Sequence, residues 1–202
     1  KKMRMRKKKN LIPRMDRCAP CHVRDGFALK GRWRESLMGD AREVHVELGC
    51  GKGRFTAGTA AEHPDVLFIA IEKVPDALVV AMERAMDLGL KNVFFVVGDA
   101  ALLPDYFAPD EVDRVYINFC DPWPSNRHAK RRLTHRDFLN IYRQVLRTGG
   151  EIHFKTDNRA GYALSEVTRN LHEHGPQGVM TDYEAKFFAQ GLPIHRCVGT
   201  KN

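Results

Sequence analysis

The sequence predicts an α/β fold in which a mostly parallel sheet is covered by helices on both faces. From residue 44 onward, short runs of β-branched and aromatic residues alternate with segments whose apolar residues recur every three or four positions. The short runs are almost continuously apolar, as expected for strands that are buried on both sides. In sheets of this kind, ligands bind beyond the carboxyl ends of the strands.

The predicted strands are 44–48, 66–72, 93–97, 114–119 and 151–156, and the predicted helices are 54–63, 75–88 and 134–146. One apolar stripe of the second helix consists of Ala77, Val80, Ala81, Arg84, Ala85 and Leu88. Gly89 follows as the expected C-cap. Helical crossovers between successive strands require parallel pairing.

The positive charge of the chain is concentrated at its N-terminus. The 202 residues have a formal net charge of +8, and residues 1–17 contain nine basic residues and one acidic residue, Asp16. We expect residues 1–30 to be a flexible basic arm, which either binds phosphates or is a solvated tail. With 43% hydrophobic residues, residues 31–202 are predicted to form one domain around one core.

The composition also predicts where the protein is found. No stretch approaches the roughly 18 apolar residues of a membrane span, and the arm lacks the apolar region of a signal peptide. Five scattered cysteines favour a reducing compartment with free thiols. We therefore expect a cytoplasmic protein that does not bind membranes, and the sequence leaves its oligomeric state, monomer or homodimer, open.

The segment Cys18-Ala-Pro-Cys21-His22 matches the pattern of c-type haem attachment. A haem protein of that class would require export, and a zinc site would require a second pair of ligands. A redox pair is a further alternative. We expect two loop cysteines and no metal.

A glycine loop follows the first predicted strand. Gly49, Gly51 and Gly53 follow Glu47 at two-residue intervals and precede a helix. Such glycines allow a tight turn and a close approach of the backbone to a ligand. A dinucleotide-binding fingerprint would need Gly or Ala where the chain has Arg54, and a phosphate-binding P-loop would need Lys followed by Ser or Thr.

Acidic residues follow three successive strands. Glu47 precedes the glycine loop, Glu72 ends the second strand, and Asp99 with Ala100 follows the third. Glu72 is placed to accept the hydroxyls of a ribose, Asp99 the amino group of an adenine, and Glu47 the cationic end of an amino acid. An acidic crevice favours a ligand with an ammonium and a sulfonium, S-adenosylmethionine, over phosphate-containing NAD.

A stiff loop follows the fourth strand. It reads Asp121-Pro122-Trp123-Pro124 and continues through Ser125 into a basic stretch. The prolines stop the strand and hold Asp121 and an aromatic ring beside the crevice. Residues 127–132 contain Arg127, His128, Lys130, Arg131 and Arg132, a charge density suited to binding phosphates.

These segments together resemble the bacterial tRNA (guanine-N7-)-methyltransferase family. The resemblance covers most of residues 31–196 and is most specific in the Asp121–Pro124 loop with its basic continuation, in Lys155-Thr-Asp-Asn, and in Thr181-Asp-Tyr-Glu184. It implies a Rossmann-like class I methyltransferase fold that uses S-adenosylmethionine, a tRNA substrate, and methylation of guanine N7 in the variable loop.

The resemblance also implies roles for individual residues. Glu47, Glu72, Asp99 and Asp121 correspond to cofactor-binding acids, and Asp121 is also the catalytic position. Residues 127–132 correspond to the RNA-contacting segment, whereas Asp157 and residues 181–184, including Thr181, Tyr183 and Glu184, correspond to the guanine site.

The chain departs from the family pattern at two places. Ser125 stands where the family usually has a Lys that binds substrate, so that contact is in question. The segment between His174 and Thr181 is too short for the strand expected there.

Two rival functions remain open: an amino-group methyltransferase, which normally has Asp/Asn-Pro-Pro-aromatic at this strand end, and a non-catalytic RNA-binding protein.

Overall fold

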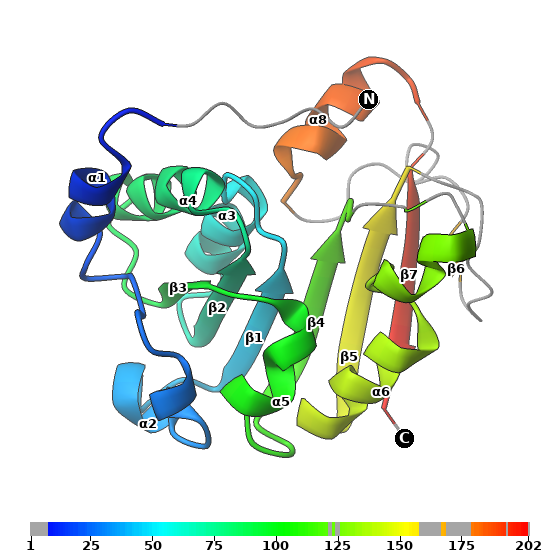
Figure 1. The fold of residues 1–202 in the computed structure, drawn as a ribbon, viewed down its shortest axis with the longest axis horizontal. Helices are drawn as coiled ribbons and strands as arrows, with labels where there is room; N and C mark the ends of the chain where they lie inside the picture. The colour runs from blue at the N-terminus through cyan, green and yellow to red at the C-terminus, as the bar shows by residue number, and fades with distance from the viewer. Residues whose placement is uncertain are drawn as a thin grey trace.

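The computed structural model describes residues 8–120, 123, 126–157, 167–168, 179–192 and 194–201. In this part of the chain, one seven-stranded sheet has the order β3-β2-β1-β4-β5-β7-β6 (Figure 1). Its parallel strands are β1 (Glu43–Leu48), β2 (Val66–Glu72), β3 (Val93–Val97), β4 (Val112–Asn118) and β5 (Leu146–Thr156). Strand β7 (His195–Thr200) runs antiparallel to β5, and β6 (Val167–Thr168) antiparallel to β7. The predicted mostly parallel sheet is confirmed.

The register of the central strands aligns their carboxyl ends. Leu48 at the end of β1 is paired with Ile71 of β2 and with Ile117 of β4. Asn118 at the end of β4 is paired with Lys155 of β5. We refer to this side of the sheet as the carboxyl edge, because the loops that follow the parallel strands all start there.

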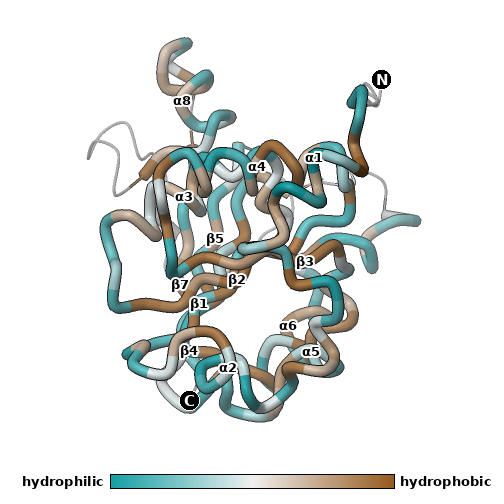
Figure 2. Tube along the Cα trace, turned by 90° about the vertical axis from the view of Figure 1, so that its left-hand side faces the viewer, coloured by the Kyte–Doolittle hydropathy of each residue, from teal (hydrophilic) through white to brown (hydrophobic). Residues whose placement is uncertain are grey.

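Helices cover both faces of the sheet, as the sequence predicts (Figure 2). Helices α1 (Leu11–Arg17), α3 (Arg54–Glu62) and α4 (Pro75–Asp87) lie on one face. Helices α2 (Trp33–Leu37), α5 (Leu103–Tyr106) and α6 (Arg136–Val145) lie on the other. Helix α8 (Asp182–Ala189) lies beyond the carboxyl edge (Figure 1). Short 3-10 helices are η1 (Phe27–Leu29), η2 (Ala100–Leu102) and η3 (Asn126–Arg131).

Strand β2 shows why the apolar runs are continuous. Alternate side chains of a strand point to opposite faces of the sheet, and here each face has its own core. Leu67, Ile69 and Ile71 pack with Trp33 and Tyr142 in the core beneath α2, α5 and α6. The intervening side chains, Val66, Phe68 and Ala70, pack in the core beneath α1, α3 and α4.

Helix α4 buries a different stripe from the predicted one. Its buried side chains are Ala77, Leu78, Val79, Ala81, Met82 and Ala85. Leu88, which the prediction placed in the stripe, lies beyond the helix and is 58% exposed. The buried face is wide because α4 packs against α1 as well as against the sheet: Arg14 of α1 donates to both carboxylate oxygens of Glu83, at 2.7 and 2.5 Å.

The segment from residue 10 to residue 30 packs on the domain. After α1, Cys18 and Cys21 are buried, and the backbone of residues 21–23 pairs with Phe95 of the edge strand β3. Burial raises the pKa of the Cys21 thiol to about 12, so this thiol stays protonated. This segment, which lies within the predicted arm, covers the edge of β3, which would otherwise be open.

Two further observations concern the described residues. None of their helices is both long and apolar enough to span a membrane. Among them, no group of three or more His, Cys, Asp or Glu side chains is arranged to hold a metal ion, and Cys18 and Cys21 are free thiols.

Candidate functional site

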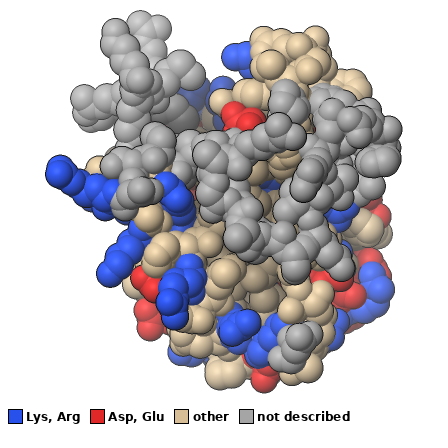
Figure 3. All heavy atoms as spheres, turned by 90° about the vertical axis from the view of Figure 1, so that its right-hand side faces the viewer, with Lys and Arg blue, Asp and Glu red and all other residues tan. Residues whose placement is uncertain are grey.

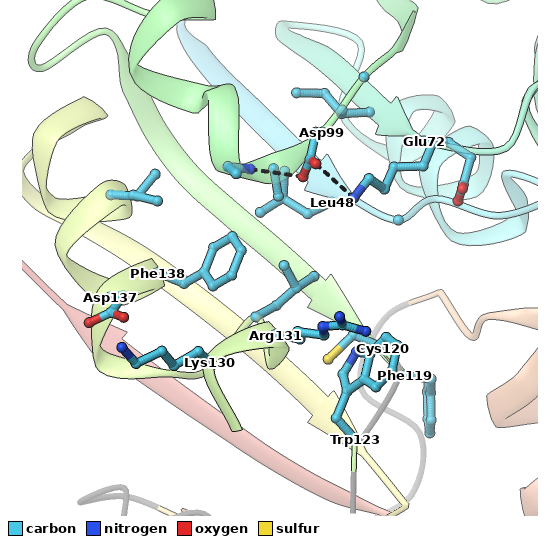
Figure 4. Close-up of a pocket in the computed structure, with 18 residues that line it drawn as sticks. Leu48, Glu72, Asp99, Phe119, Cys120, Trp123, Lys130, Arg131, Asp137 and Phe138 are labelled. Carbon is cyan, nitrogen blue, oxygen red and sulfur yellow. Dashed lines mark hydrogen bonds and ion pairs between the residues drawn. The ribbon is translucent and has the colours of Figure 1, made fainter. Parts of the chain in front are cut away.

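A cavity of about 780 Å³ lies at the carboxyl edge of the sheet. The ends of four parallel strands and the turns that follow them form one wall, which contains Leu48, Gly49, Glu72, Lys73, Asp99, Ala100, Phe119 and Cys120. The opposite wall comes from η3 and α6 and contains Lys130, Arg131, Asp137, Phe138 and Ile141. Figure 4 shows Glu72 and Asp99 on one side of this cavity and Arg131, Trp123 and Phe138 away from them on the other.

The glycine loop has the backbone conformation that its sequence predicts. Gly49, Gly51 and Gly53 have φ angles of 75°, 56° and 72°, which side chains rarely adopt. A Cβ atom at Gly53 would lie 2.5 Å from the Cβ of Ala81, so this glycine lets the loop pack against α4. A Cβ at Gly49 or Gly51 would meet no described atom within 4 Å. Gly49 lines the cavity, whereas Gly51 and Gly53 support the turn.

Glu72 connects the end of β2 to the glycine loop. Its two carboxylate oxygens accept hydrogen bonds from the backbone N–H of Gly51, at 3.0 Å, and of Val74, at 2.9 Å. The side chain is half-buried and lines the cavity. The two hydrogen bonds hold this carboxylate at one position on the cavity wall.

Asp99 is held by a backbone hydrogen bond and an ion pair. Its carboxylate accepts from the N–H of Ala101 at 3.1 Å and lies 2.7 Å from the Lys73 ammonium (Figure 4). Partial burial opposes ionisation of Asp99, but the contacts with Lys73 and Ala101 outweigh it and lower the pKa of this carboxyl. Asp99 is therefore ionised at neutral pH.

Glu47 does not line the cavity. Its side chain is 2% exposed, accepts a hydrogen bond from the Asn118 amide at 3.0 Å, and accepts another from the Thr56 hydroxyl. Burial raises the pKa of Glu47 to about 7, although the hydrogen bonds from Thr56 and Asn118 oppose this change. Of the three acids that follow successive strands, only Glu72 and Asp99 therefore reach the cavity.

The stiff loop after β4 is described in part. Asp121 and Ser125 lie outside the described residues. Phe119 and Trp123, on either side of Asp121, have positive φ angles of 51° and 42°. Such angles are uncommon for aromatic residues and occur where the surrounding structure imposes them, often at functional sites.

The basic segment, residues 127–132, and Trp123 contact each other. Arg132 donates two hydrogen bonds to the Trp123 carbonyl, at 3.1 and 3.0 Å. The Arg131 guanidinium lies 5.0 Å from the centre of the Trp123 ring, and the His128 ring makes a T-shaped contact with the same ring. Arg127 and Lys130 are exposed. Arg132 thus holds the loop, whereas Arg127 and Lys130 face solvent.

Basic side chains occur at several places on the surface. On the face shown in Figure 3, Lys and Arg side chains lie at both margins and along the lower part, with Asp and Glu among them. Residues 127–136 contain five Lys or Arg residues and no acid. This part of the chain supplies positive charge close to the cavity wall that Lys130 and Arg131 form.

The predicted guanine-site residues lie just after β5 and at the start of α8. Asp157 directly follows β5 and is half-buried. The Thr181 hydroxyl caps α8 by accepting from the N–H of Glu184 at 2.9 Å. Tyr183 is 49% exposed, but Glu184 is 2% exposed and forms an ion pair with Lys155 at 3.1 Å. None of these residues lines the cavity, but Tyr183 contacts Phe119, which does.

Sequence reasoning missed several residues of the cavity. Lys73 pairs with Asp99, and Asp137, Phe138 and Ile141 project from α6. Lys73 directly follows Glu72, so its position at a strand end was a usable signal. The three residues on α6 had no such signal, because the sequence does not show which face of that helix meets the carboxyl edge.

Comparison with known proteins agrees with this description. A family model described as a putative methyltransferase matches residues 41–197. The tRNA (guanine-N(7)-)-methyltransferase of Lactococcus lactis subsp. cremoris (strain MG1363) is 43% identical, over 96% of each chain. The enzyme of that name from Geobacillus kaustophilus (strain HTA426) is 45% identical, over 87% of this chain and 86% of the relative.

Solved structures show the same fold. A structure described as an antibiotic related methyltransferase has a TM-score of 0.63 and 20% identity, over 82% of this chain and 92% of its own. The 16S rRNA methyltransferase KamB has a TM-score of 0.64 and 14% identity, over 83% and 92%. The fold is that of class I methyltransferases. Because relatives above 40% identity match nearly its whole length, the chain belongs to the tRNA (guanine-N(7)-)-methyltransferase family.

Proposed function

We propose that this protein transfers a methyl group from S-adenosylmethionine to N7 of a guanine in the variable loop of tRNA. The observation that carries the proposal is the cavity at the carboxyl edge, in a chain of this family. The acids Glu72 and Asp99 form one wall, and the basic residues Lys130 and Arg131 form the other. An acidic site for a cationic cofactor thus adjoins a surface suited to RNA phosphates.

The residues on the strand-end wall fit S-adenosylmethionine. Glu72 is placed to accept the two ribose hydroxyls, and Asp99 is placed to accept from the adenine amino group. Phe138 and Ile141 provide apolar surface on the opposite wall. When bound, the cofactor supplies a methyl group that is activated by a sulfonium. The glycine loop exposes backbone next to Gly49 and supports this site.

Methyl transfer to guanine N7 needs positioning more than proton transfer. N7 of neutral guanine carries a lone pair, so no base has to remove a proton before attack. Most of the rate enhancement then comes from aligning N7 with the methyl–sulfur axis. Because the guanine becomes cationic, carboxylates at the site stabilise the developing charge. We assign this electrostatic and positioning role to Asp121, together with Asp157.

The basic segment is the proposed contact with tRNA. Arg127 is exposed, and the exposed Lys130 and Arg131 line the cavity. Such side chains bind phosphates in a salt-dependent manner that is independent of base sequence. The N-terminal residues extend the positive charge of the chain. We place the activity in the cytoplasm, which the cysteine content supports.

The test is methylation of total tRNA with labelled S-adenosylmethionine, followed by mapping of the modified base. We expect label at guanine N7 in the variable loop. Label at an exocyclic amine would support the rival amino-group methyltransferase and overturn the proposal. Absence of any transfer, with cofactor bound or not, would also overturn it.

The role of Asp121 is tested in the same assay. An Asp121→Ala variant is expected to stay folded and to lose turnover by at least about a hundredfold, as for other removals of electrostatic stabilisation. The matched control is Asp65→Ala, since Asp65 pairs on the surface with Arg42 and lies at the opposite end of β2 from Glu72. A folded Asp121→Ala variant with transfer close to that of the unmodified protein would contradict the assignment.

A further inference from the structure

Helix α8 is joined to the sheet by a buried ion pair. The Lys155 ammonium on β5 lies 3.2 and 3.1 Å from the two carboxylate oxygens of Glu184, and the two side chains are 7% and 2% exposed. Burying two charges carries a large desolvation penalty, and two apolar side chains of similar size often stabilise a protein equally well. A pair of this kind is better explained by the arrangement that it specifies than by the stability that it adds.

The same carboxylate determines where α8 begins. Glu184 and Thr181 form a capping box: the Thr181 hydroxyl accepts from the N–H of Glu184, and Glu184 Oε2 accepts from the N–H of Thr181 at 3.4 Å. One carboxylate therefore links the first turn of α8 to β5. A shift of Glu184 would move the start of the helix relative to the sheet.

Lys155 is itself held by neighbours from other elements. Its ammonium lies 5.6 Å from the centre of the Phe55 ring on α3. Its backbone carbonyl accepts from the N–H of Phe119 at 2.9 Å, and it is paired in the sheet with Asn118. Asn118 in turn binds Glu47. Lys155 thus lies in a row of buried polar side chains that crosses β1, β4 and β5.

Tyr183 is the residue whose position depends on this arrangement. It precedes Glu184 in the chain, is half exposed, and stacks on Phe187 with ring centres 4.8 Å apart. Its ring centre is 5.4 Å from that of Phe119, which lines the cavity. Asp182 also pairs with Arg54 and Arg84, at 3.6 and 3.5 Å, but these pairs are partly exposed and hold the helix less firmly.

We propose that Lys155 is a positioning residue for methyl transfer. Through Glu184 it holds α8 so that Tyr183 and the helix start at Thr181 face the target base beside the cavity. Lys155 acts through Glu184 and touches neither cofactor nor base. This inference rests on the proposed function, and it predicts that the pair governs the rate of the chemical step more than the affinity for tRNA.

Three variants test the proposal. Lys155→Met with Glu184→Met replaces the pair by apolar side chains of similar length and leaves no unpaired buried charge. Glu184→Asp shortens the carboxylate by one methylene and lengthens the distance to Lys155. In Glu184→Asp combined with Lys155→Arg, the longer Arg side chain compensates for the shorter carboxylate and restores the ion pair. The control is Lys201→Met, which removes one positive charge from the pair with Asp110 near the amino end of β5.

The measurements are single-turnover methyl transfer to tRNA, tRNA affinity, affinity for S-adenosylhomocysteine, and the midpoint of thermal unfolding. We expect transfer to slow about tenfold or more in the apolar pair and in Glu184→Asp, with both affinities changed less than about threefold. Lys155→Arg in the Glu184→Asp background should recover at least half of the lost rate, and Lys201→Met should match the unmodified protein.

Two outcomes overturn the proposal. One is a transfer rate within twofold of the unmodified protein in Glu184→Asp or in the folded apolar pair. The other is a failure of Lys155→Arg to recover any rate, which would assign Glu184 a direct role that is independent of Lys155. If the apolar pair does not fold, the comparison between Glu184→Asp and its Lys155→Arg partner decides. Failure of the unmodified protein to methylate tRNA would instead refute the proposed function.

Discussion

Among single residues, Glu47 shows how the pleat of a strand separates neighbouring side chains. Leu48 lines the cavity and packs in one core, whereas Glu47 points to the opposite face and binds Thr56 and Asn118. The acid at the end of β1 is therefore buried support for the site. Its pKa of about 7 makes its contribution to stability depend on pH near neutrality.

The first prediction concerns this pH dependence. The ordinary pKa of a Glu is 4.5, and burial raises the pKa of Glu47 to about 7. Between these values the unfolded chain releases the proton and the folded chain keeps it. The free energy of unfolding must therefore fall as pH rises through this range, by about 3 kcal/mol at most.

Glu47→Gln removes this dependence. The stability difference between the variant and the unmodified protein should favour the variant more at pH 8 than at pH 4.5. At pH 4.5 the folded unmodified protein holds Glu47 as a neutral carboxylic acid, so its side chain is uncharged like that of Gln. Urea denaturation at pH 4.5, 6 and 8 measures the difference. A stability difference that stays constant over this range would show that Glu47 ionises normally in the folded protein.

At the scale of elements, the turn between β1 and α3 packs closely against α4 at Gly53. Gly53 has a positive φ, and an added Cβ would lie 2.5 Å from the Ala81 Cβ and 2.8 Å from its Cα. Neither atom is the end of a flexible side chain. The loop that supports the cofactor site and helix α4 therefore fit together only if this position has no side chain.

Gly53→Ala should destabilise the protein by about 2–5 kcal/mol, since a left-handed backbone costs roughly 1–2 kcal/mol and overpacking roughly 1–3 kcal/mol. The matched control is Gly39→Ala, because a Cβ at Gly39 would meet no described atom within 4 Å. The control should change stability by less than about 1 kcal/mol. Equal effects of the two substitutions in chemical denaturation would contradict the close packing.

The helix η3 and the residue after it contain basic side chains with two different tasks. Lys130 is exposed on the cavity wall, whereas Arg132 holds the Trp123 carbonyl with two hydrogen bonds. Lys130→Gln should weaken tRNA binding and lower the slope of log affinity against log salt by about 1. Arg132→Lys keeps its charge, so it should leave that slope unchanged.

The two substitutions should affect turnover in the opposite order: Arg132→Lys should reduce it more than Lys130→Gln. Arg132→Lys removes the two-pronged hydrogen bonding to the loop that contains Asp121, and we expect turnover to fall roughly tenfold. Lys130→Gln should reach nearly full turnover at saturating tRNA. Filter binding from about 50 to 300 mM salt, together with steady-state kinetics, measures both effects, and similar profiles for the two variants would refute the division of tasks.

For the whole molecule, the positive charge lies at the N-terminus and in residues 127–136, and the cavity between sheet and α6 is lined by acids as well. Residues 1–7 contain five Lys or Arg residues. Replacing all five by Gln should weaken tRNA binding and lower the salt slope by roughly one for each phosphate that these side chains neutralise.

The replacement should leave the unfolding midpoint unchanged, because the packing of α1 on α4 depends on Arg14 and Glu83 instead. A chain with Arg14→Gln is the matched control: it should lower the midpoint and change the salt slope by at most about 1. An arm variant with the affinity and salt slope of the unmodified protein would remove the N-terminal charges from the binding model.

Local patterns were sufficient for much of the fold. The predicted strands 66–72 and 93–97 agree with β2 and β3 at both ends, because a buried parallel strand is an uninterrupted apolar run that its turn residues delimit. Helix α6 and strand β5 were less well separated: β5 begins at Leu146, where the helix was expected to end. Periodicity does not distinguish the two states over a few residues.

The sequence by itself determined the five parallel strands, the glycine loop, the motifs of the family, and the acids that follow successive strands, because each of these is a pattern of residues close together in the chain. Tertiary structure alone decided that Glu72 and Asp99 reach the cavity while Glu47 does not, that α6 supplies Phe138, and that Lys155 meets Glu184. The reason is physical: which side of a strand or helix faces a site depends on how distant elements pack, and no local pattern contains that information.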